Sequence, residues 1–183
     1  MRVRRKYIRS VAERLLTSHA ISSAPVPVEK LAFALGIDVR STRPGDISLS
    51  GFLVRDDGTG QAIVGINKDH HKNRQRFTIA HEIGHFLLHA GQEIYVDECS
   101  KSGLRISLRD EDSSKGTERD EIEANVFAAE LLMPVELLQA DIVSANIRDE
   151  DKLEEVLDTL AKEYEVSKQA LTYRLVNLGY IHL

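Results

Sequence analysis

The sequence predicts an α+β domain in which helices flank a small three-stranded sheet. Apolar residues recur with helical spacing in both the first and the last third of the chain. Between these regions, two β-rich segments, residues 48–54 and 62–66, stand on either side of a turn cluster. With 183 residues the chain is long enough to bury a core, and its single cysteine, Cys99, excludes an internal disulfide framework.

The first predicted elements are two helices and a strand. The apolar positions of the first helix lie three or four residues apart, at Ile8, Val11, Ala12, Leu15 and Leu16. A second helix follows Pro27, and Gly36 ends it. Residues 37–41 form a short strand. The two β-rich segments then pair as a hairpin across the turn cluster of residues 56–60.

A helix over about residues 73–89 follows the hairpin. The polar residues 98–119 predict a mostly irregular insertion, in which residues 104–108 could make a short strand. The next helix runs over residues 120–132 and is closed by Met133 and Pro134. Further helices are expected at about residues 134–143, 150–163 and 167–177.

The last two of these helices resemble a helix-turn-helix, and Ser167 is placed to cap the second one. The charge opposes DNA binding, because residues 149–183 carry eight acidic and only four basic side chains. Affinity for DNA depends on Lys and Arg at the phosphates. We divide the chain into a domain over residues 1–135 and a C-terminal helical extension over residues 136–183, which contains these last helices.

No segment of the sequence predicts export or a membrane span. The basic start of the chain is not followed by an apolar stretch, because Arg9, Glu13 and Arg14 interrupt it. No run of eighteen apolar residues occurs in the sequence. Together with the low cysteine content, this predicts a cytoplasmic protein.

The segment His81-Glu82-Ile83-Gly84-His85 carries the predicted chemistry. Two histidines four positions apart on a helix project from nearly the same face, so both imidazoles can bind one ion. Neutral imidazole is a good zinc ligand, and a catalytic zinc ion typically has three protein ligands and a water. In H-E-x-x-H peptidases the intervening glutamate, here Glu82, reaches that water as the catalytic base. The alternative is that both histidines are ordinary helix residues.

The third metal ligand has to come from another element. His89 continues the spacing, but on a continuous helix it stands about 12 Å along the axis from His81, too far for one ion. We expect it to be packed in the core or to contact a ligating residue. In the predicted helix 120–132, Glu121 and Asn125 share a face.

We therefore expect Glu121 to be the third ligand, and Asn125 to orient a ligating histidine through its second ring nitrogen. Glu123 and Glu130 of the same helix point to other faces. Two imidazoles and a carboxylate suit Zn²⁺, and also Mn²⁺ or Fe²⁺.

Two parts of the sequence resemble the ImmA/IrrE family of metallopeptidases. The first consists of Ile66–Asn67 followed by Arg74–His89, and the second is Glu121–Pro134. The resemblance implies a small zincin-like fold and a metallo-endopeptidase of the HExxH, gluzincin-like type. It also implies the same ligands and the same base as the helix geometry. Better-known members cut helix-turn-helix repressors and so release genes of mobile elements or of a stress response. A repressor of this kind is therefore the implied substrate.

Two other functions compete with the peptidase. The fold could serve as a non-catalytic protein-binding module, like an antitoxin or antirepressor, but the intact Glu82 argues against a dead enzyme. A DNA-binding regulator would depend on the last two helices alone. For the peptidase, we expect a hairpin strand, residues 48–54 or 62–66, to bind the substrate by strand addition.

Overall fold

A computed structural model of the chain describes residues 2–43, 49–56, 61–89, 94–98, 111–145, 147 and 152–182. The helices within these ranges are α1 (Arg5–Ser18), α2 (Val28–Ala34), α3 (Lys72–Leu88), α4 (Glu111–Leu132), α5 (Val135–Ala145), α6 (Leu153–Glu163) and α7 (Lys168–Asn177). The strands are β1 (Ile37–Thr42), β2 (Leu49–Asp56), β3 (Gln61–Asn67) and β4 (Ile94–Glu98). The α+β class is confirmed.

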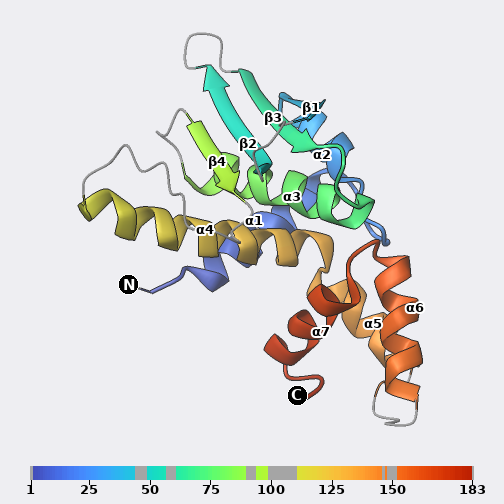
Figure 1. Ribbon diagram of the computed structural model, residues 1–183. Helices are drawn as coiled ribbons and strands as arrows, with labels where there is room; N and C mark the ends of the chain where they lie inside the picture. The colour runs from blue at the N-terminus through green and yellow to red at the C-terminus, as the bar shows by residue number, and fades with distance from the viewer. Residues whose placement is uncertain are drawn as a thin grey trace.

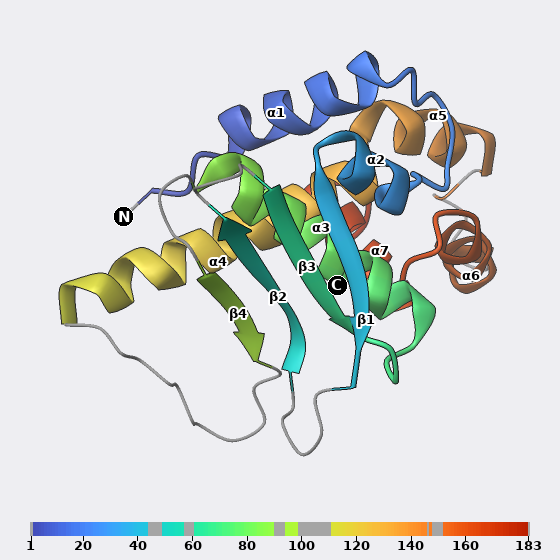
Figure 2. The same ribbon diagram turned by 90° about the horizontal axis from the view of Figure 1, so that it is seen from above.

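The four strands form one mixed sheet in the order β1-β3-β2-β4 (Figure 2). The strand β3 pairs parallel to β1, and β2 pairs antiparallel to both β3 and β4. The three expected strands are thus present, but the sheet has four strands instead of three. The added strand β4 has only five residues. So short a segment gives little periodicity, which is why the pattern did not indicate it.

The helix α4 also differs from the expectation. It begins at Glu111 instead of Asp120, so part of the stretch 98–119 that we expected to be irregular is helical. This part of the sequence lacks apolar periodicity, but Glu, Lys and Arg are good helix formers, and a polar extension of a helix needs no buried face. The strand suggested at residues 104–108 lies outside the described residues.

The helix α3 is the central element of the fold. It contacts β2 and β3 on one side and α4 on the other (Figure 1). Residues 78–85 are all buried, so this part of α3 is covered on every side. Among the helices that the structure describes, none is long and apolar enough to cross a membrane.

Two glycines allow α3 to approach its neighbours closely. A Cβ atom on Gly84 would lie 3.1 Å from Cδ1 of Phe127 and 3.2 Å from Cα of Ala124, both on α4. On the sheet side, a Cβ atom on Gly51 of β2 would lie 2.3 Å from Cγ2 of Thr78. A side chain at Gly84 would therefore require Phe127 or Ala124 to give by a few tenths of an ångström, and one at Gly51 would require Thr78 to shift.

The C-terminal helices are fastened to this core. Buried apolar residues of α6 and α7 belong to the same cluster as those of α1, α3 and α4. A buried ion pair adds to the contact: Arg174 of α7 places Nη1 and Nη2 at 2.9 and 2.6 Å from the two oxygens of Glu130 in α4. Arg9 of α1 reaches the same carboxylate at 3.3 Å. The division of the chain at residue 135 remains a prediction.

The substitution Gly84→Ala tests the close packing of α3 on α4. In a helix without crowding, this change would raise the free energy of unfolding by about 1 kcal/mol. Here the added methyl group meets α4, so we expect the free energy of unfolding to fall by about 1–3 kcal/mol. Urea denaturation measures the change, and a more stable variant would contradict the proposed packing.

The substitution Arg174→Leu tests the buried ion pair. It leaves the carboxylate of Glu130 buried with only the longer contact from Arg9, so we expect urea denaturation to show a loss of about 3 kcal/mol. Arg40→Leu is the matched control, because Arg40 pairs with Asp38 on the surface and its loss should cost less than about 1 kcal/mol. An equal loss in the free energy of unfolding for the two variants would show that burial does not increase the contribution of the ion pair to stability.

Candidate metal centre

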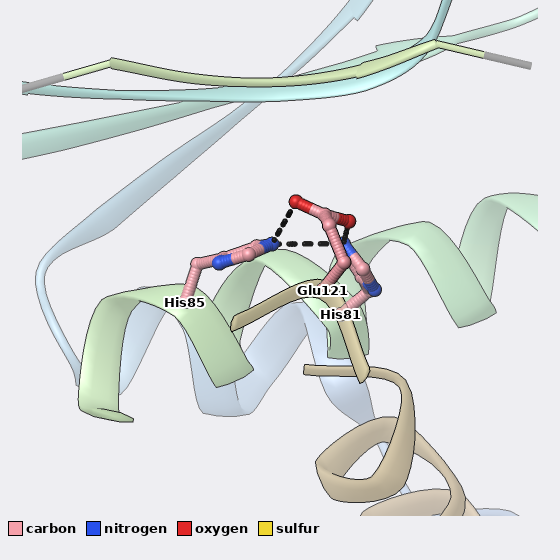
Figure 3. Close-up of side chains that lie close together, drawn as sticks. All are labelled: His81, His85 and Glu121. Atoms are coloured by element: carbon pink, nitrogen blue, oxygen red, sulfur yellow. Dashed lines mark hydrogen bonds and ion pairs between the residues drawn. The ribbon is translucent and has the colours of Figure 1, made fainter. Parts of the chain in front are cut away.

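Three predicted ligands converge between α3 and α4. His81 and His85 come from α3, and Glu121 comes from α4 (Figure 3). The Nε2 atoms of the two histidines are 3.0 Å apart. Oε2 of Glu121 lies 3.3 Å from Nε2 of His81, and Oε1 lies 3.2 Å from Nε2 of His85. The structure thus brings together the three side chains that helix geometry had selected from the sequence.

These separations fit a metal ion. Four ligands at 2.0–2.1 Å from zinc stand roughly 3.3–3.4 Å apart at the corners of a tetrahedron. The two ring nitrogens are 3.0 Å apart, and each lies 3.2–3.3 Å from one of the two oxygens of Glu121, which is close to this distance. Two imidazole nitrogens and one carboxylate oxygen also match the donors that zinc accepts, so the residues present fit the ion.

The ionisation of His85 and Glu121 also suits metal binding. Burial lowers the pKa of His85 and outweighs the opposite effect of Glu121. For Glu121, burial would raise the pKa, but hydrogen bonds with His81 and His85 outweigh it and bring the pKa to about 2. A neutral imidazole and an ionised carboxylate are the forms that bind a cation without first losing a proton.

Asn125 lies where it was expected, one turn beyond Glu121 on α4. Its Oδ1 is 3.1 Å from Nδ1 of His81. An amide oxygen only accepts hydrogen bonds, so Nδ1 of His81 donates its proton there and leaves the Nε2 lone pair toward the other ligands. This is the orienting contact that the spacing of Glu121 and Asn125 predicted.

The predicted base, Glu82, is fully buried. It lies on the sheet side of α3, where a Cβ atom on Gly51 of β2 would come within 3.4 Å of its Oε1. The carboxylate thus lies under β2, and the helical repeat offsets Glu82 by about 100° from His81.

Arg55 of β2 was not identified from the sequence. Its Nη2 donates to the carbonyl oxygens of His85, Phe86 and His89, at 2.8, 2.9 and 3.2 Å. A cation at a helix C-terminus complements the helix dipole, so Arg55 fixes the end of α3 to the sheet. No local spacing could have indicated this role, because the contacts cross thirty or more residues of sequence.

The chain is similar to known metallopeptidases. The family model of the IrrE N-terminal-like domain, peptidase M78, matches residues 32–176, which include the three converging side chains. Metallopeptidase ImmA of Bacillus subtilis (strain 168) is 33% identical over 90 residues, which cover 49% of this chain and 44% of that protein.

A solved structure shares the fold. The Mycobacterium tuberculosis transcriptional regulator superposes with a TM-score of 0.56 at 14% identity, over 93% of this chain and 46% of that one. The chain thus matches less than half the length of each of these two relatives. The family match covers well over half of the chain, and it confirms the resemblance found in the sequence. This chain belongs to the IrrE N-terminal-like domain family of metallopeptidases.

Proposed function

We propose that this protein is a zinc-dependent endopeptidase in which His81, His85 and Glu121 hold the metal and Glu82 is the catalytic base. The convergence of these three side chains, whose nitrogen and oxygen atoms lie 3.0–3.3 Å apart, on the helix that also carries the buried Glu82 supports this function best. Zinc is the favoured ion, and Mn²⁺ or Fe²⁺ would suit the same donors.

A zinc ion bound there supplies a Lewis acid that lowers the pKa of water and polarises the scissile carbonyl. The protein's own residues supply the proton transfers and the alignment. Glu82 takes a proton from the attacking water and passes one to the leaving amine. Asn125 keeps the ring of His81 in place through the 3.1 Å contact with Nδ1.

The sheet order changes the proposed binding site for an extended substrate. Both hairpin strands, β2 and β3, are paired on two sides, so neither can add a substrate strand as expected from the sequence. In the sheet as described, β1 and β4 are the edges, and β4 is the edge near α4, which carries Glu121 (Figure 2). We place the substrate strand against β4.

The proposed substrate is a helix-turn-helix repressor, and the proposed location is the cytoplasm, where such repressors act. The family resemblance supports this choice of substrate. Binding of DNA by the C-terminal helices is not favoured, because both basic residues of α7 are in ion pairs. Arg174 contacts Glu130, and Lys168 contacts Glu154 and Asp158.

The purified wild-type protein should contain one zinc ion per chain by elemental analysis. Glu82→Gln should keep the zinc but cut a repressor encoded beside the gene at least ~100-fold more slowly, because general-base catalysis is lost. Mass spectrometry of the repressor measures the cleavage. Glu29→Gln, on the surface of α2, is the control and should cut at the wild-type rate.

Two results would count against the peptidase. A folded wild-type protein that takes up no metal would contradict the proposed site. A zinc-loaded wild-type protein that forms a stable complex with the repressor without producing fragments would instead support the alternative, a non-catalytic binding module.

A further inference from the structure

We infer that His89, Glu123 and Arg4 form a relay of hydrogen bonds that starts at Nδ1 of His85. This relay holds the His85 ring in the tautomer that binds metal. The inference rests on the proposed metal site. In this relay His89 is a positioning residue: it contacts the ligand His85 and is not itself a ligand of the same ion.

The first step concerns the proton on His85. Its Nε2 lies 3.0 Å from Nε2 of His81 and 3.2 Å from Oε1 of Glu121, so in the proposed site this nitrogen offers its lone pair to the metal. The ring proton of neutral His85 then sits on Nδ1. Nδ1 of His89 is 3.2 Å away and must accept this proton in a hydrogen bond.

The second step fixes the tautomer of His89 from its other side. If Nδ1 accepts, the proton of neutral His89 is on Nε2. This atom lies 3.3 Å from Oε2 of Glu123 and 3.5 Å from Oδ1 of Asp120. Ionised carboxylate oxygens only accept hydrogen bonds, so they require a donor at this nitrogen. The two sides of the ring therefore demand the same tautomer independently.

The third step concerns the end of the relay. Glu123 is fully buried, and Arg4 donates to both of its oxygens through Nε at 3.1 and 3.0 Å, and also through Nη2. The backbone N–H of Arg4 donates to Oε1 at 3.0 Å. The guanidinium and the backbone N–H of Arg4 thus hold the Glu123 carboxylate as an ion-paired acceptor that faces His89.

A second metal ion is the main alternative for this cluster, since His89, Asp120 and Glu123 also offer donor atoms within 4.8 Å of one another. The charges favour the relay. Arg4 neutralises Glu123, and Arg119 lies 3.3 Å from Oδ1 of Asp120. Two carboxylates facing two guanidinium groups leave no net negative charge for a divalent cation, which would have to displace Arg4.

Zinc affinity of the full chain, measured by competition with a chromophoric chelator, tests the relay. His89→Leu removes the acceptor for His85, so we expect the dissociation constant for zinc to rise about 10–100-fold. His89→Gln keeps an acceptor oxygen and a donor nitrogen in one side chain, and it should restore most of the affinity. Arg4→Gln should weaken binding by less than His89→Leu, and Arg5→Gln, the adjacent exposed control, should leave binding unchanged.

Long-range ¹H–¹⁵N NMR of the zinc-loaded wild-type protein gives a readout that needs no variant. We expect the ring proton of His85 on Nδ1 and that of His89 on Nε2. A proton on Nδ1 of His89, unchanged zinc affinity in His89→Leu, or two zinc ions per wild-type chain would each overturn the relay while leaving the proposed peptidase standing. A folded wild-type protein without zinc would overturn the proposed function itself.

Discussion

The distance between α3 and α4 controls the candidate metal centre. His81 and His85 lie on one helix and Glu121 on the other, so the distances of 3.2–3.3 Å from the ring nitrogens to the carboxylate oxygens hold only while the helices stay in close contact. Gly84 lies between the two histidines and allows this contact, because its missing side chain leaves room for Phe127 and Ala124. The glycine in the motif thus has a packing role that is separate from the chemistry of its neighbours.

The parts of the site that follow from helix geometry could be predicted from the sequence. His81, Glu82 and His85 are fixed relative to one another by a single helix, and Glu121 with Asn125 by another. The contacts that join distant segments could not be predicted. Arg4 meets Glu123 across 119 positions, and no periodicity relates them. The rise of the helix per residue predicted that His89 and His81 do not bind the same ion. It could not predict which residues surround the His89 ring.

The fold shows the same division between local and distant information. The predicted helices and the first three strands have strong local patterns, whereas β4 is too short to show one. The order β1-β3-β2-β4 depends on which strands pair, and the sequence pattern contains no such information. This order mattered for function, because it placed both hairpin strands inside the sheet and moved the proposed substrate strand to β4.

Both ends of the chain are attached to α4. Near the N-terminus, Arg4 and Arg9 contact Glu123 and Glu130, and near the C-terminus Arg174 contacts Glu130 again. The helix that carries Glu121, the proposed third ligand, is therefore also the helix to which both terminal regions are attached. A protein that pulled on either end, or a domain fused there, would transmit its force to the helix that carries Glu121. The separation of Glu121 from His81 and His85 would then depend on tension applied far from the site.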